Sequence, residues 1–370
     1  MRRTPEDDIE RPEATTACAW IGITPPKDRT YITGLEEHSI GCAKGEQDSS
    51  WIACIAGAMA ALGEDFSYPY LMGVSGAAFR VQMHQPNWCP SAPCAVVGYD
   101  CVPGAMKATG YKLSWMPVQR ASDKEQAKAQ GLPTLQASIE RGIAVIYSSE
   151  EASLAVGFGQ NGQRIIRQYV ANGPGYVTTD DWPWYIGVIE PHELPMERRA
   201  VVAQSLHLAV TLAKTERFGQ YHSGFAALRK WADDLEDDAR FDALTQGNWF
   251  PIAHGNGYCY GSLWSARFNA ERYLREVAEG YEDLAKSRLL DLAGLYQQMH
   301  QTLARTKPEF ECIWSLQPWN LKSPASWTRA VRLKEAALLR EALQIEQQAI
   351  PEIEKLLPLL EDPAQASDSV

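Results

Sequence analysis

A pair of serines at the start of a predicted helix is the first feature of this chain that could do chemistry. Ser49 and Ser50 follow Gln47 and precede an apolar stretch, Trp51 to Met59, whose large side chains recur at helical spacing. Hydroxyl side chains at such a position can cap the helix. The positive end of the helix dipole also favours a developing anion there. The segment therefore predicts either a nucleophilic hydroxyl or a simple helix cap.

A serine nucleophile needs a base, and a carboxylate beside a later strand is the candidate. An unassisted serine hydroxyl is almost wholly protonated at neutral pH. Glu151 stands next to Glu150 and just before the apolar strand predicted at 154–158. Partial burial would raise its pKa. Two interpretations stay open: Glu151 acts as a general base or orients a substrate amine, or it is a solvated carboxylate at a strand end.

The loop at residues 84–94, HQPNWCPSAPC, offers a second nucleophile. His84 and Cys89 lie close in sequence, and a thiol is activated by a nearby imidazole. Three prolines stiffen the loop, and Trp88 is expected to line the same cleft as a rigid wall. The alternative is that the loop only shapes the cleft and takes no part in the reaction.

Composition limits the class of partner. The chain has 370 residues, with 35 basic against 46 acidic side chains and a formal net charge of −11. Such a balance argues against nucleic acid as a partner. No apolar run reaches the ~18 residues of a membrane span, and the first residues lack the apolar region of a secretory signal. Eight cysteines without a CxxC spacing predict reduced thiols in a cytoplasmic protein with no metal and no cofactor.

The pattern of elements predicts an α+β domain followed by an all-helical domain. Residues 1–29 are expected to be a mobile tail, 30–192 the α+β domain, 193–362 the helical domain and 363–370 a disordered tail. In the first domain, helices are expected at 50–63, 100–109 and 123–141. Strands at 143–147, 154–158, 164–170 and 184–189 would form a mainly antiparallel sheet, with a hairpin turn at Asn161-Gly162.

Three polar side chains in the helical half are candidate ligand contacts. His254, Asn256 and Arg267 fall near the beginning of a helix expected at 255–279. Side chains from a second domain often close a pocket formed by the first. We therefore expect these three to bind substrate, or else to form hydrogen bonds between the domains.

Several segments together resemble a known family. These are LGEDFSYPYLMGVSGAAF after Ser49, then HQPNWCPSAP, then EEASLAVGF, and HGNGYCYGSLWSARFNAERYLREVA in the helical half. They resemble relatives of butirosin biosynthesis protein H, which have a papain-like amino-terminal domain and a helical carboxy-terminal part. The resemblance places the nucleophile position on Ser49 or Ser50, the histidine position on Glu151, and an oxyanion-binding glutamine on Gln47. The thiol and imidazole of the family are thus replaced.

The resemblance implies acyl or aminoacyl transfer, or amide hydrolysis, on a small amine-bearing substrate of specialised metabolism. A peptide substrate and an acyl-carrier donor fit the same chemistry. A second interpretation is a non-catalytic protein that binds a small molecule or peptide on a papain-like scaffold. A third is a homo-oligomer whose helical half is the interface.

Overall fold

In the computed structural model the described residues are Ile32, Leu35, 47–84, 87–117, 124–148, 151–158, 164–167, 176–179, 182–191 and 196–361. Contacts divide the chain into two compact units. Unit 1 is Met1–Leu71 with Ala105–Met196, and unit 2 is Met72–Gly104 with Glu197–Val370. Residues 72–104 thus belong with the helical half, whereas the sequence predicted one boundary at residue 192. The two predicted tails and the Asn161-Gly162 turn lie outside the described residues.

Unit 1 is built on an antiparallel sheet of six strands in the order β2-β7-β3-β4-β5-β6. The predicted antiparallel pairing is therefore confirmed, with β6 as an unpredicted edge strand. The elements are α1 (Ser50–Ala61), α2 (Tyr68–Val74), α3 (Val102–Thr109), β2 (Tyr111–Pro117), α4 (Lys124–Glu140), β3 (Val145–Ser148), β4 (Ala152–Phe158), β5 (Arg164–Arg167), β6 (Val177–Thr179) and β7 (Tyr185–Pro191). The boundary between the units falls inside α2 and α3.

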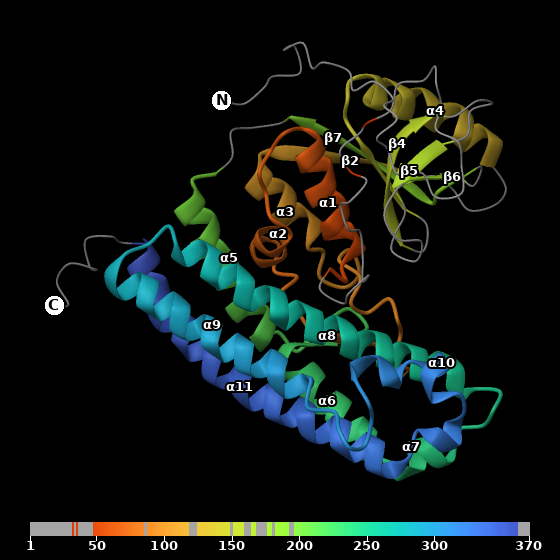
Figure 1. The fold of residues 1–370 in the computed structure, drawn as a ribbon, viewed down its shortest axis with the longest axis vertical. Coiled ribbons are helices and arrows are strands. Elements are labelled where there is room, and N and C mark those ends of the chain that lie inside the picture. The colour runs from red at the N-terminus through yellow and green to blue at the C-terminus, as the bar shows by residue number, and fades with distance from the viewer. Residues whose placement is uncertain are drawn as a thin grey trace. The chain divides into compact units, whose positions relative to one another are not determined.

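Helices cover both faces of this sheet (Figure 1). On one face, Leu135 and Ile139 of α4 pack with Val145, Tyr147, Ala155 and Ile186. Because side chains alternate along a strand, Ile146 and Leu154 face the other way, and α1 packs against β3 and β4 on that side. Ten of the residues of α1 are buried, which explains its almost uniformly apolar sequence.

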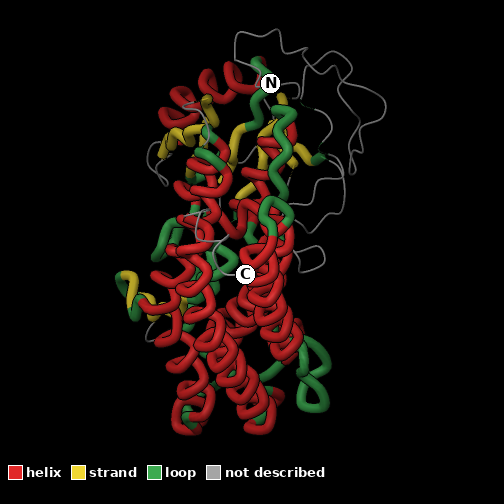
Figure 2. Tube along the Cα trace, turned by 90° about the vertical axis from the view of Figure 1, so that its left-hand side faces the viewer, coloured by secondary structure: helices red, strands yellow, loops and turns green. Residues whose placement is uncertain are grey.

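Unit 2 is a helical bundle with a small sheet. Its long helices lie side by side, α8 against α9, α9 against α11, and α11 against α5 and α6 (Figures 1 and 2). The elements are β1 (Gln82–His84), α5 (Arg198–Lys214), β8 (Arg217–Phe218), β9 (Tyr221–Ser223), α6 (Gly224–Glu236), α7 (Asp238–Asp242), α8 (Trp249–Ala278), α9 (Asp283–Leu303), η2 (Ile313–Leu316), α10 (Pro318–Leu321), η3 (Pro324–Ser326) and α11 (Arg329–Glu361).

The segment 72–104 is held in unit 2 by strand pairing and by ring packing. Strand β1 pairs with β9 across Met83 and His222, so the second half of the chain is not purely helical as predicted. Phe79 is 1% exposed and packs edge-on against Tyr273 of α8 and Tyr296 of α9. The sequence pattern indicates a short strand at 79–83, which overlaps β1, whereas β9 is missed because a strand of three residues depends on its partner for stability.

Helix α8 begins six residues earlier than the predicted start at 255. The sequence placed Pro251 before the helix, but proline is tolerated in the first turn, where the N–H would have no helical acceptor. Helix α4 agrees with its predicted range to within a few residues, and α5, α9 and α11 likewise match the helical patterns at 195–215, 281–305 and 326–360. Among the described helices, none is both long and apolar enough to cross a membrane.

Candidate functional site

The start of α1 presents free backbone N–H groups. The first helical hydrogen bond runs from Ala53 N to Ser49 O, at 3.0 Å, so the N–H groups of residues 50–52 have no acceptor within the helix. Ser49 is the N-cap residue, yet its side chain makes no capping bond, contrary to the simple cap considered from the sequence. Its own N–H donates to Tyr68 Oη at 3.0 Å. The positive end of the helix dipole therefore lies at Ser49 and Ser50.

Ser50 and Glu151 form a direct hydrogen bond. Ser50 Oγ donates to Glu151 Oε2 at 2.7 Å, and it accepts a hydrogen bond from Ala152 N at 3.2 Å. This confirms the predicted proximity of Glu151 to the helix start. The pair lies where the start of α1 meets the beginning of β4, and Ser50 is only 3% exposed there. A hydroxyl in contact with a carboxylate has the arrangement of a nucleophile with its general base.

Two more polar atoms beside the pair have no partner. Gln47 Oε1 and Ser49 Oγ are both buried, and neither makes a hydrogen bond in the described part of the chain. Buried polar atoms in proteins are normally bonded to protein or water. These two atoms are therefore available to a ligand or to ordered water at the helix start.

The predicted Cys89–His84 pair is not supported. His84 lies at the end of β1 in unit 2, and both ring nitrogens are engaged: Nδ1 with Asn87 O at 2.8 Å and Nε2 with Gln220 Oε1 at 3.1 Å. An imidazole held by two other groups is not placed to take a proton from Cys89. The Cys89 carbonyl instead accepts a weak hydrogen bond from the Cys259 thiol at 3.6 Å.

Trp88 is a core residue of unit 2 and not a cleft wall. It is 3% exposed, and its ring packs against Phe241 and Trp327 with the Arg240 guanidinium over one face at 4.5 Å. Helix α8 approaches it closely, since a Cβ at Gly255 would lie 2.6 Å from Trp88 O. The loop packs closely on α8 at Trp88, a contact that the count of prolines could not reveal.

Arg267 and Asn256 are buried inside unit 2 and form hydrogen bonds with protein groups. Arg267 is fully buried and pairs with Glu346 at 2.7 Å, and its Nη1 donates to Ala78 O at 2.9 Å. Asn256 accepts from the Trp231 indole at 2.7 Å and donates to Glu335 Oε1 at 2.8 Å. Both predicted ligand contacts are thus structural.

Glu335 is a titratable group that the sequence analysis missed. It is completely buried, and burial raises the pKa of its carboxyl from 4.5 to about 8, against the opposing effect of the hydrogen bond from Asn256. Its position within α11 resembles that of any charged residue on a helix face, so no local pattern marked it. The group is a neutral acid in a core, which suits a structural hydrogen bond.

His254 lies among aromatic rings on α8 and α10. Its ring centroid is 6.2 Å from Phe250, 6.0 Å from Tyr258 and 5.5 Å from Trp319. Desolvation by these neighbours lowers the pKa of the imidazole below its usual range. This ring cluster lies in unit 2. None of these three ring contacts supplies His254 with an acid or a base for catalysis.

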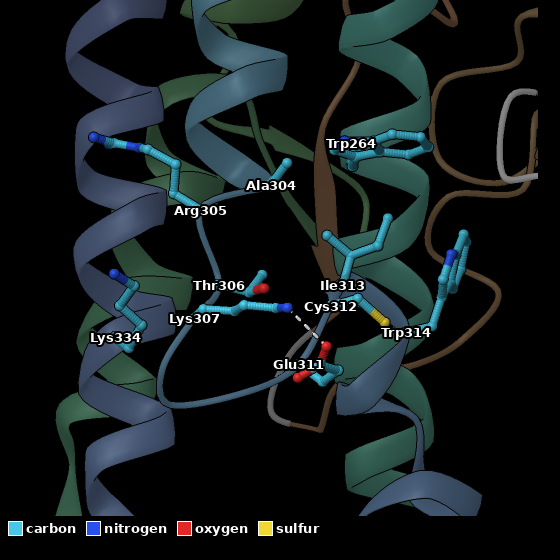
Figure 3. Close-up of a pocket in the computed structure, with 10 residues that line it drawn as sticks. All are labelled: Trp264, Ala304, Arg305, Thr306, Lys307, Glu311, Cys312, Ile313, Trp314 and Lys334. Carbon is cyan, nitrogen blue, oxygen red and sulfur yellow. Dashed lines mark ion pairs between the residues drawn. The ribbon is translucent and has the colours of Figure 1, made fainter.

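A cavity of about 610 Å³ opens in unit 2 near the end of α9 (Figure 3). None of the predicted site residues lines it; the lining residues are Trp264, Ala304, Arg305, Thr306, Lys307, Glu311, Cys312, Ile313, Trp314 and Lys334. Lys307 pairs with Glu311 at 2.8 Å, and Lys334 lies 3.9 Å from Glu309. Because its lysines have acidic partners, the cavity presents little unbalanced charge to a ligand.

The possibility of a metal centre and the comparisons with known proteins also bear on the site. Among the described residues, no three His, Cys, Asp or Glu side chains gather in a way that could hold a metal ion. No model of a protein family matches the sequence, and a comparison with curated proteins gives no match.

Proposed function

We propose that unit 1 is a papain-like domain that transfers an acyl or aminoacyl group to a small amine, or hydrolyses an amide, through Ser50. The observation that carries this proposal is the 2.7 Å hydrogen bond from Ser50 Oγ to Glu151 Oε2 at the first turn of α1. A helix start on one face of an antiparallel sheet, with a base on a neighbouring strand, fits the papain-like arrangement that the sequence resembles.

In this mechanism Ser50 Oγ attacks the carbonyl carbon of the acyl donor and its proton passes to Glu151. The bond from that carbon to the leaving group breaks, and the leaving group takes the proton. An amine or water then attacks the acyl-serine, Glu151 accepts its proton, and the proton returns to Ser50 as the ester bond breaks. N–H groups at the helix start would stabilise both oxyanions.

A specific observation also favours a second candidate, a non-catalytic binding protein. Ser50 is 3% exposed, and its oxygen already accepts a hydrogen bond from Ala152 N. A carboxylate, with an ordinary pKa of about 4.3, is a much weaker base than an imidazole at about 6.5. In this case the hydrogen bonds of Ser50 join the start of α1 to the start of β4, and Glu151 and Gln47 bind the amine of the ligand.

A fluorophosphonate probe separates the two candidates, because it forms a covalent bond only with an activated serine. Catalysis predicts one label, on Ser50 by peptide mass spectrometry, which disappears in Ser50→Ala and persists in Ser49→Ala. Glu151→Gln should slow the labelling, because the base is lost but the hydrogen-bond geometry is kept. An unlabelled protein whose melting temperature rises with an amine ligand supports the binding candidate.

A further inference from the structure

An aromatic wall begins at the residue next to Ser50. The Trp51 indole is 5% exposed and meets the Trp115 indole edge-on, at 5.1 Å between ring centroids and an interplanar angle of 75°. Trp115 lies on β2 and is 40% exposed. The wall thus runs from the buried first turn of α1 out to solvent.

Tyr185 extends this wall along the sheet. Its ring lies 6.5 Å from that of Trp115 at 79°, and it is 47% exposed. Gly187 makes room for the Trp115 ring, since a Cβ there would approach the ring carbon Cζ3 to 2.9 Å. The absence of a side chain at residue 187 therefore allows the indole to pack directly over β7.

Strand register places the wall at the same end of the sheet as Glu151. Tyr185 pairs with Ser148 of β3, and Ser148 pairs with Ala152 of β4, the residue after Glu151. Directly paired residues in antiparallel strands point to the same face. The side chains of Tyr185 and Ala152 therefore lie on one face, the face on which α1 packs.

The chemistry of the wall suits a cation. Exposed aromatic rings attract an ammonium group over their faces, and Glu151 supplies a negative charge at the same end of the sheet. The net charge of −11 further favours approach of a positive ligand. Among large apolar side chains of the described residues, only Trp115, Tyr185, Phe250 and Trp319 are exposed, and two of the four are here.

The geometry points to an alkylammonium-binding site in which Trp115 and Tyr185 hold the charged group of the substrate beside Glu151. This inference rests on the proposed function, because it assigns a charged group to the substrate that reaches the Ser50–Glu151 pair. The bound ammonium group is distinct from the attacking nitrogen, which must be neutral to react, and its recognition falls to residues that the reaction itself does not use.

Choline and dimethylbutanol, its isostere with carbon in place of the charged nitrogen, test the inference. Binding is measured by isothermal titration calorimetry on the full chain carrying Ser50→Ala, so that no acylation is needed. We expect choline to bind about tenfold more tightly than the alcohol, the scale of a desolvated cation–π contact. Tyr185→Ala and Trp115→Ala should abolish that preference, and Trp115→Phe should keep most of it.

Matched controls complete the test. Glu151→Gln should weaken the binding of choline but leave the binding of dimethylbutanol unchanged. Trp319→Ala, at an exposed aromatic residue of unit 2, should change the binding of neither probe. Equal binding of the two probes, absence of binding, or a preference that survives loss of both rings would overturn the inference. Choline binding by a protein whose Ser50 no fluorophosphonate labels would overturn the proposed reaction and leave the ammonium site standing.

Discussion

Ser50 and Glu151, 101 residues apart in the chain, share a hydrogen bond of 2.7 Å that joins the start of α1 to the start of β4. The same serine oxygen receives the N–H of Ala152. One hydroxyl thus connects a helix, a carboxylate and a strand. The hydroxyl of the neighbouring residue, Ser49, makes no hydrogen bond in the described part of the chain, although it also lies at the start of α1.

Ser50→Ala and Ser49→Ala should therefore differ in stability. Removing the Ser50 hydroxyl leaves the Ala152 N–H and one Glu151 oxygen without this partner, which costs about 1–3 kcal/mol for buried groups. Removing the Ser49 hydroxyl deletes no hydrogen bond, so the expected change is within about 0.5 kcal/mol. Urea denaturation followed by circular dichroism measures both, and equal losses would contradict the described geometry.

The carboxyl group of Glu335 should make stability depend on pH. Its pKa is about 8 in the folded chain against 4.5 ordinarily, so folding retains a proton that the unfolded chain releases. Stability from this group is complete below pH 4.5 and is lost as pH rises to about 8, with a slope of at most about 1.4 kcal/mol per pH unit. Urea midpoints measured across this range should decline with pH.

Glu335→Gln should flatten that decline, because the amide cannot titrate. Glu282→Gln, at an exposed position at the start of α9, serves as the matched control and should leave the slope unchanged. A wild-type profile that rises through this pH window and does not respond to Glu335→Gln would show that the carboxyl group is ionised in the folded chain.

The pair of Arg267 and Glu346 should behave as a buried structural unit. Arg267→Met leaves the Glu346 carboxylate buried with Tyr296 at 3.3 Å as its remaining partner, a loss expected to cost about 3–5 kcal/mol. Changing both members, Arg267→Met with Glu346→Leu, should cost less than the sum of the single changes. A double-mutant cycle gives the coupling, and additive losses would contradict a paired geometry.

Cys89→Ala should leave reactivity unchanged, since His84 is bonded to Asn87 and Gln220 and is not its base. Trp88→Ala should instead destabilise unit 2 by about 3–5 kcal/mol, the usual cost of truncating a buried tryptophan. Fluorophosphonate labelling and urea unfolding test the two statements separately. Loss of labelling in Cys89→Ala with an unchanged unfolding curve would contradict this expectation, because the reactivity of the labelled serine would then depend on the Cys89 thiol.

Local sequence was enough to predict most elements of this protein. The apolar period of 50–61, the alternating strands and the long helices of the second half are all visible in short windows, because each depends on which face of an element is buried. The proximity of Glu151 to the helix start came from the resemblance to a family, and the hydrogen bond confirms it.

Tertiary structure alone decided which segments share a core. Residues 72–104 join unit 2 because Phe79 packs on α8 and α9, and because Arg267 reaches the carbonyl group of Ala78 across 189 positions of sequence. It also decided that Trp88 and Asn256 are structural, and that Trp115 and Tyr185 form one wall. Periodicity shows that a side chain is buried or exposed, but its partners depend on long-range packing, whose free energy no short window contains.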